Sequence, residues 1–292
     1  MRRVLSEFQQ AEYATAGVLF PVAALQPEET ARFREAFLEL ARCLGGKPRV
    51  GQMQNLHLFH PWALELASHP RILNAVEDLI GPDILVHSTT LFCKYPGDGK
   101  FVSWHQDGFY YGLQRFDYTS AWIALTDSDS DNGCMRVVRG SHCAGMHPHA
   151  ETAVSPGNML ASGMEVALEV DEREATDIVL AAGEVSFHDV AIVHGSNGNT
   201  SSRMRMGFAV RYVSPQERQM LDHIPTVLVR GEDRHRHYRL LLNPPEAGRS
   251  VNPIEAIRAQ ETVGKWILAA RKNNGLIPFP PESGLRWAEP TE

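Results

Sequence analysis

Residues 184–212 read EVSFHDVAIVHGSNGNTSSRMRMGFAVRY, two apolar runs separated by a polar turn. The pattern predicts a strand over 184–194, a turn at 197–199, and a returning strand over 204–212. Further short runs rich in Val, Ile, Thr and aromatic residues predict five more strands, over 84–95, 101–104, 120–126, 135–138 and 178–180. Short strands with turn residues between them indicate an antiparallel sandwich or barrel.

Helical patterns flank this β segment. A proline and two acidic residues begin a run over 27–44 whose apolar residues recur every three or four positions, and Gly45-Gly46 follows it. Two more helices are predicted over 70–80 and about 253–270. We therefore expect a mainly β protein with flanking helices in a single domain. Its parts are a helical N-terminal region over about 1–83, a β core over about 84–213 that carries a long loop at 141–176, and a C-terminal extension over about 214–292.

Composition excludes several classes of function. The 292 residues contain 28 Lys and Arg against 35 Asp and Glu, a net charge of -7. Such a balance argues against a nucleic-acid-binding or anionic-membrane surface, and we expect neither nucleic acid nor membrane as a partner. Four cysteines without a CxxC pair are typical of a reducing compartment. No apolar stretch has the length of a signal peptide or a membrane span, so we expect a cytoplasmic protein.

The motif Trp104-His105-Gln106-Asp107-Gly108 places a histidine and a carboxylate two residues apart. On an extended backbone both side chains project from one face, while Gln106 points away. This triplet alone is weak evidence for a metal site. A second imidazole from His194, at the end of the predicted strand, would complete a face of two histidines and one carboxylate. Such a face leaves positions open on an octahedral ion, as in non-haem Fe(II) oxygenases, whereas structural zinc prefers a closed tetrahedral shell.

The returning strand independently indicates a binding site for an anionic ligand. Alternation places Arg205, Gly207, Ala209 and Arg211 on one face. The two small residues would leave space for a ligand beside the guanidinium of Arg205. An unpaired arginine inside a barrel is costly, and a carboxylate is its natural partner. A small dicarboxylate that chelates the metal at one end and meets Arg205 at the other fits this need.

Taken together, the motifs resemble the phytanoyl-CoA dioxygenase family of Fe(II)/2-oxoglutarate-dependent oxygenases. The resemblance covers about 84–213 and rests on five motifs in order: Trp104-His105-Gln106-Asp107-Gly108, Ala121-Trp122-Ile123-Ala124-Leu125, Asn132-Gly133-Cys134-Met135, Arg139-Gly140-Ser141-His142, and His194-Gly195-Ser196 with Arg205 eleven residues after the histidine. It implies a double-stranded β-helix, a jelly-roll or cupin-like core. It also implies that His105, Asp107 and His194 bind iron, that Arg205 and Ser196 bind the distal carboxylate of 2-oxoglutarate, and that Trp122 lies near this cosubstrate.

The activity implied by the resemblance is hydroxylation of an unactivated C–H bond in a small or medium-sized organic metabolite. Its cofactors would be Fe(II), 2-oxoglutarate and O2, with 2-oxoglutarate converted to succinate. Some members of the family are halogenases with Gly or Ala in place of the carboxylate ligand; Asp107 therefore favours hydroxylation. Desaturation, epoxidation and cyclisation stay open as outcomes, as does a non-catalytic jelly-roll binding protein. The substrate, free or attached to CoA or a carrier, and the oligomeric state are left open.

Several residues are weaker candidates for substrate contact. They are Asn55, His57, Trp104, Tyr110 and Arg211. His188 would point to the same face of the strand as His194, because the two residues are six positions apart. On one extended strand, however, they would lie roughly 20 Å from each other. We therefore expect His188 to be a hydrogen-bonded structural histidine. The pair His147 and His149 is expected in a lid over one end of the β core.

Overall fold

The computed structural model describes residues 3–48, 50–110, 117–151, 157–160, 164–218, 225–246, 251–272 and 283–288. It divides into two compact units that are interleaved along the chain. The first unit comprises Met1–Thr30, Phe92–Tyr110 and Thr119–Ala209, and the second comprises Ala31–Leu91, Tyr111–Tyr118 and Val210–Glu292. Among the described helices, none has both the length and the apolar character needed to cross a bilayer.

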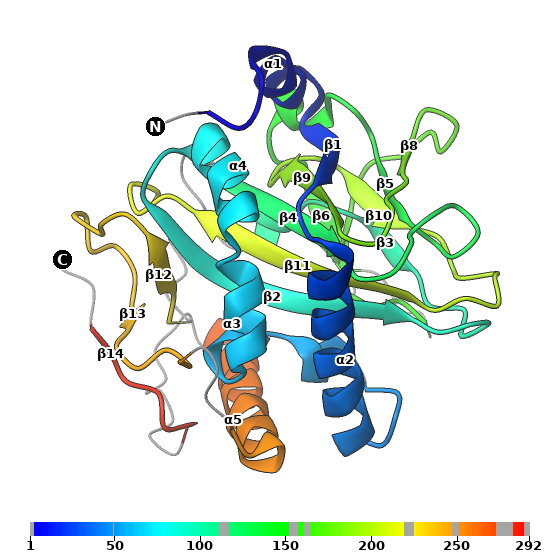
Figure 1. The fold of residues 1–292 in the computed structure, drawn as a ribbon. Coiled ribbons are helices and arrows are strands. Elements are labelled where there is room, and N and C mark those ends of the chain that lie inside the picture. Colours follow the sequence, from blue (N-terminus) through cyan, green and yellow to red (C-terminus); the bar gives the residue numbers. More distant parts are fainter. Residues whose placement is uncertain are drawn as a thin grey trace. The chain divides into compact units, whose positions relative to one another are not determined.

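Two antiparallel sheets build the first unit (Figure 1). The larger has the order β1 (Val18–Ala23), β9 (Glu184–Asp189), β4 (Tyr118–Ala124), β11 (Arg205–Val213), β2 (Ile84–Lys94) and β12 (Val227–Arg230). Of these strands, β4, β11 and β2 have residues in both units, and β12 belongs to the second unit. The smaller has the order β3 (Val102–His105), β10 (His194–Ser196), β5 (Met135–Val137) and β8 (Thr176–Ile178). The sequence predicted strands in all of these places except β1 and β12, although the limits differ by up to a few residues.

The core of the first unit lies between its two sheets. Trp122 and Ala209 of the larger sheet and Val137 and Ile178 of the smaller sheet belong to one buried apolar cluster. Because side chains alternate along each strand, the same strands also direct polar residues to defined positions inside the sandwich. The expected mainly β, jelly-roll fold with flanking helices is therefore confirmed.

Two predictions for the first unit are wrong in detail. The N-terminal region is not all helical, because α1 (Glu7–Ala16) ends at Gly17, in a left-handed conformation with φ 72°, and β1 follows. Pro21 lies in this strand, at the edge of the sheet. A proline is tolerated at an edge because its missing N–H does not have to pair with a neighbouring strand. The predicted single strand over 184–194 is also broken, since β9 ends at Asp189 and β10 begins at His194 in the other sheet.

The long loop predicted over 141–176 contains further regular structure. A short 3-10 helix covers Ser141–Ala144. The strands β6 (His149–Glu151) and β7 (Met164–Val166) pair with each other as a small antiparallel sheet. His149 therefore lies on a strand rather than in an irregular lid.

The second unit is built around helices and a sheet edge. α2 (Pro27–Cys43), which begins in the first unit, α3 (Pro61–Ala67), α4 (Pro70–Ile80) and α5 (Pro253–Lys272) agree with the predicted helices and add α3. β12 (Val227–Arg230) pairs with β2, and β13 (Leu240–Leu241) pairs with β14 (Trp287–Ala288). A separate apolar core includes Leu58, Val227, Val263 and Trp266.

Candidate metal centre

Three predicted ligands come together in the first unit. His105 ends β3, Asp107 follows it at the start of a 3-10 turn (Asp107–Tyr110), and His194 begins β10. β3 and β10 are antiparallel neighbours in which His105 and His194 are directly paired, with ring centroids 4.1 Å apart. One potential ligand atom from each of the three residues lies within 4.8 Å of the other two, and all three side chains are buried. The local spacing His-x-Asp and the strand pairing therefore create one cluster.

The tautomers of both histidines follow from their backbone partners. Nδ1 of His105 lies 2.9 Å from the carbonyl oxygen of Ser103, and Nδ1 of His194 lies 3.1 Å from that of Ile192. A carbonyl oxygen only accepts, so each Nδ1 carries the proton and donates it, and each Nε2 keeps its lone pair for a metal. Burial, together with the neighbouring His105, holds the pKa of His194 well below its usual value. His194 is thus neutral, as a ligand must be.

The carboxylate of Asp107 has two distinct oxygens. Oδ2 accepts a hydrogen bond of 2.8 Å from the hydroxyl of Ser120 on β4. Oδ1 lies 3.8 Å from Nε2 of His105, on the side of the histidine pair. The residues therefore offer two imidazole nitrogens and one carboxylate oxygen, all from buried side chains. This donor set fits Fe(II) with open positions and does not form the closed four-ligand shell of structural zinc.

A buried cation lies in the same unit. Arg205, at the start of β11, is 2% exposed, and its Nε donates a long hydrogen bond of 3.4 Å to the hydroxyl of Ser128. Burial lowers the pKa of Arg205 to about 10, so it stays charged at neutral pH. Within the described parts of the chain, no carboxylate forms an ion pair with this guanidinium. An anionic ligand would satisfy it.

Lys94 is a second buried cation that the sequence reasoning missed. Its ammonium, on β2, donates to the carbonyl oxygens of Gly133 (3.0 Å) and Asn197 and to the hydroxyl oxygen of Ser196 (2.6 Å). Because Ser196 accepts this bond, its own proton is available for another acceptor. Burial and the charge of Arg205 lower the pKa of Lys94 to about 6. The three oxygen acceptors around the nitrogen use all three N–H groups of an ammonium, so we assign the protonated form. A charged residue in the otherwise apolar run 91–95 was the available signal.

Trp122 occupies the space that was expected to hold a ligand beside Arg205. Its ring lies 4.3 Å from the guanidinium carbon, in cation–π geometry. A Cβ atom built on Gly207 would come within 1.7 Å of the Trp122 ring, and Ala209 packs in the core. The expectation that Gly207 and Ala209 leave an empty space is therefore wrong, because the indole fills it. Gly207 instead allows Trp122 to lie against Arg205.

His188 is placed differently from its prediction. Strand β9 ends at Asp189, and the chain then turns so that His194 comes back toward His188. The ring centroids of the two histidines are 4.9 Å apart. Nε2 of His188 lies 3.8 Å from Oδ2 of Asp107. Neither ring nitrogen has a hydrogen-bond partner among the described residues. The expected separation of roughly 20 Å assumed an unbroken strand, and the expected hydrogen-bonded structural role is not observed.

The predicted substrate residues are divided between the two units. Trp104 lies on the face of β3 opposite to His105, with the Arg136 guanidinium carbon 5.8 Å from its ring, a placement that does not support substrate contact. The side chain of Tyr110 lies outside the described residues. Asn55, His57 and Arg211 are buried in the second unit.

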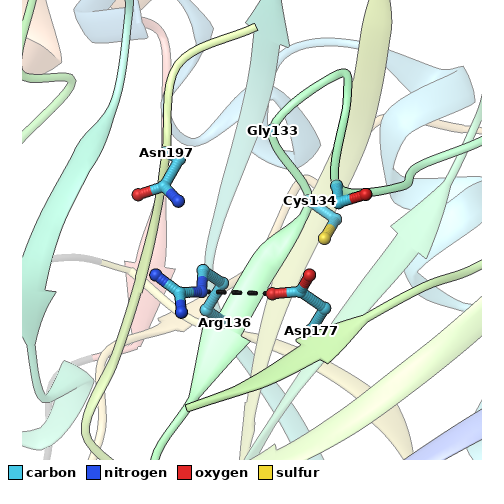
Figure 2. A pocket seen from close by; sticks show the side chains of 6 residues that line it. Gly133, Cys134, Arg136, Asp177 and Asn197 are labelled. Carbon is cyan, nitrogen blue, oxygen red and sulfur yellow. Dashed lines mark hydrogen bonds and ion pairs between the residues drawn. The ribbon is translucent and has the colours of Figure 1, made fainter. Parts of the chain in front are cut away.

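A small pocket opens beside Arg136, and none of the three ligands lines it. Figure 2 shows Arg136 of β5 and Asp177 of β8, joined by an ion pair of 3.1 Å, together with Gly133, Cys134 and Asn197. The pocket has a volume of about 140 Å³. Arg136 also pairs with Glu172 at 2.9 Å, so its charge is already balanced. Arg136 differs in this from Arg205, for which the described residues supply no carboxylate partner.

The comparisons with known proteins agree with this geometry. The family model described as Phytanoyl-CoA dioxygenase (PhyH) matches residues 13–207. A probable alpha-ketoglutarate-dependent hypophosphite dioxygenase from Stutzerimonas stutzeri is 26% identical over 214 residues, 73% of this chain and 70% of that protein. The peroxisomal phytanoyl-CoA dioxygenase of Homo sapiens is 30% identical over 151 residues, 50% of this chain and 44% of that protein, so the match spans less than half of the human enzyme. The solved structure of the non-heme monooxygenase ThoJ, in its apo form, is 33% identical, covers 91% of this chain and 99% of its own, and has a TM-score of 0.74.

Proposed function

The chain belongs to the phytanoyl-CoA dioxygenase (PhyH) family of Fe(II)/2-oxoglutarate-dependent dioxygenases, and we propose that it hydroxylates an unactivated C–H bond of a small or medium-sized organic metabolite. The observation that carries this proposal is the convergence of His105, Asp107 and His194 in the same unit as the buried Arg205, which forms no ion pair with a carboxylate among the described residues. The three metal-binding side chains alone would also suit an enzyme with a redox-inactive metal. The additional anion site supports 2-oxoglutarate as the cosubstrate.

Each residue of the centre has a distinct task in this proposal. His105 and His194 present Nε2 to Fe(II), and Asp107 presents Oδ1. The guanidinium of Arg205 and the hydroxyl of Ser196 bind the distal carboxylate of 2-oxoglutarate. Bound Fe(II) supplies the oxidation chemistry, in which 2-oxoglutarate and O2 are converted to succinate and CO2 while one oxygen atom is added to the substrate.

Lys94 and Trp122 support the cosubstrate site. The ammonium of Lys94 holds the oxygen of Ser196, so the serine proton can point to the carboxylate. The Trp122 ring covers the guanidinium of Arg205 and keeps water away from it. A dry site strengthens the charge pairing that orients 2-oxoglutarate.

Hydroxylation is proposed over halogenation because Asp107 provides the carboxylate. One coordination position cannot hold both this carboxylate and a halide. Desaturation, epoxidation or cyclisation by the same centre would give different products. The mass of the product distinguishes a gain of one oxygen from a loss of two hydrogens.

Asn55, His57 and Arg211 remain proposed substrate contacts. Oδ1 of Asn55 and Nε2 of His57 are buried without a hydrogen-bond partner among the described residues. Burial lowers the pKa of His57 to about 3, so the imidazole is neutral. The guanidinium of Arg211 donates a hydrogen bond of 3.0 Å to the hydroxyl oxygen of Thr90. Such groups would favour a polar or acidic group of the substrate.

The experiment that tests the function uses the purified protein without O2. Addition of Fe(II) and 2-oxoglutarate should produce a visible charge-transfer band, and admission of O2 should yield succinate in amounts that rise with the correct member of a substrate panel. The product should gain one oxygen atom. A protein that stays colourless and forms no succinate would instead be a non-catalytic jelly-roll binding protein.

A further inference from the structure

We propose that His188 is a positioning residue of the metal centre, which, together with Ser120, fixes the Asp107 carboxylate so that Oδ1 faces the metal. This inference rests on the proposed function, because it concerns a ligand of the same centre. It assigns a task to a histidine that sequence alone placed far away.

The pairing of two strands brings both groups to Asp107. β4 and β9 are antiparallel, and Ser120 and His188 are direct cross-strand partners, so their side chains point to the same side of the sheet. Ser120 donates to Oδ2 of Asp107 at 2.8 Å, and Nε2 of His188 lies 3.8 Å from the same oxygen. The two side chains therefore lie next to one oxygen of the carboxylate and leave the other for the metal.

His188 is not placed as a fourth ligand. The three side chains whose donor atoms lie within 4.8 Å of one another are His105, Asp107 and His194, and the described part of the chain adds no further residue to this group. His188 instead lies beside Asp107 and His194, at 3.8 Å from Oδ2 and with ring centroids 4.9 Å apart. His188 therefore lies against two of the metal ligands but is not itself a metal ligand.

No other described contact accounts for the burial of this imidazole. His188 is 2% exposed, and neither Nδ1 nor Nε2 has a hydrogen-bond partner among the described residues. Buried polar groups are normally satisfied, so an unsatisfied one points to a partner that is acquired in function. A modest turn of the Asp107 carboxylate or of the imidazole brings Nε2 and Oδ2 to hydrogen-bond distance. Outer partners of this kind orient metal ligands and raise metal affinity.

The test measures metal binding directly, with Co(II) added to the metal-free protein without O2 or 2-oxoglutarate. His188→Leu should weaken Co(II) binding about 10-fold or more and change the visible Co(II) spectrum. His188→Gln, whose amide nitrogen lies near the position of Nε2, should retain most of the affinity and the wild-type spectrum. Ser186→Ala is the matched control, since Ser186 lies two residues away on the same face of β9, is buried, and also lacks a described partner; it should bind Co(II) like the wild type.

Several outcomes would overturn the inference. Wild-type affinity and spectrum in His188→Leu would do so, as would equal weakening in His188→Leu and His188→Gln, which would indicate a purely structural role. If His188→Leu does not fold, His188→Asn replaces it: its amide nitrogen lies near the position of Nδ1, so wild-type binding by His188→Asn overturns the inference and weakened binding supports it. Failure of the wild-type protein to bind Co(II) would overturn the proposed function itself.

Discussion

In the proposed function, Arg205 is the residue that distinguishes a 2-oxoglutarate site from a bare metal site. Arg205→Ala removes a buried cation whose described surroundings contain no ion-paired carboxylate. Charge-assisted hydrogen bonds contribute about 1.5–3 kcal/mol each, so we expect 2-oxoglutarate to bind roughly 10- to 100-fold more weakly. Anaerobic titration of the Fe(II)-loaded protein with 2-oxoglutarate measures the change. Arg136→Ala, on the outer pocket, is the control and should leave the affinity intact; equal losses in both variants would contradict the assignment.

Lys94 provides a second prediction. Lys94→Met removes the donor for two carbonyl oxygens and for Ser196, and unpaired buried acceptors cost about 1–3 kcal/mol each. The variant should therefore have a lower melting temperature and a weaker affinity for 2-oxoglutarate. Calorimetric unfolding with and without 2-oxoglutarate measures both effects. A variant of unchanged stability and affinity would show that the ammonium does not support Ser196.

Individual residues of the centre differed in how far the sequence could predict them. His105 and Asp107 were accessible because their spacing of two predicted a common side, although Asp107 lies at the start of the 3-10 turn after β3 and not on the strand itself. Ser120 and His188 were not, since their relation to Asp107 depends on the pairing of β4 with β9. Lys94 was missed although it interrupts an apolar strand, which marks a position where a buried charge must be balanced.

Strand β11 shows how a single glycine determines the position of an aromatic side chain. In Gly207→Ala the new methyl group would overlap the Trp122 ring, so the indole must move away from Arg205. Overpacking of this kind costs about 1–3 kcal/mol. We expect a lower melting temperature together with weaker binding of 2-oxoglutarate, measured by thermal unfolding and anaerobic titration. Ala209→Gly on the same face is the comparison: it should lose stability but keep the cosubstrate affinity, and the same behaviour in Gly207→Ala would contradict the prediction.

Most elements followed from local pattern, whereas their ends followed from tertiary structure. Helices α2 and α4 begin and end close to the predicted residues because proline and glycine mark their limits. β1 was missed since its six residues include Pro21 and lie between two helices. The break between β9 and β10 was missed because 190–193 is as apolar as the strands, and only the change of sheet shows that the chain turns there.

The second unit should make the whole molecule sensitive to acid. Burial lowers the pKa of His57 to about 3 and that of His60 to about 4, against 6.5 in the unfolded chain. Between these values the unfolded chain binds more protons than the folded one, so the free energy of unfolding falls as the pH is lowered from 6.5 toward 4. In metal-free protein, His57→Gln and His60→Gln should each flatten the dependence of the melting temperature on pH. The exposed His235→Gln should not, and a flattening of equal size there would contradict the origin we assign.

For the whole molecule, the sequence was informative about the protein family and the fold class, and less informative about how the chain divides into compact units. The motif order predicted the family, and the strand-rich centre with helical flanks predicted the architecture. The division into two units was not accessible, because each unit combines three separate segments and strands β2, β4 and β11 belong to both. Local periodicity carries no information about which distant segments associate.

The central claim is that one metal ion binds His105, Asp107 and His194. Crystals of the protein grown without O2 in the presence of Fe(II) and measured at the iron absorption edge test it most directly. We expect a single strong anomalous peak in the first unit, within bonding distance of Nε2 of both histidines and of a carboxylate oxygen of Asp107. An iron peak bound to other residues, or none in protein that has retained iron, would contradict it.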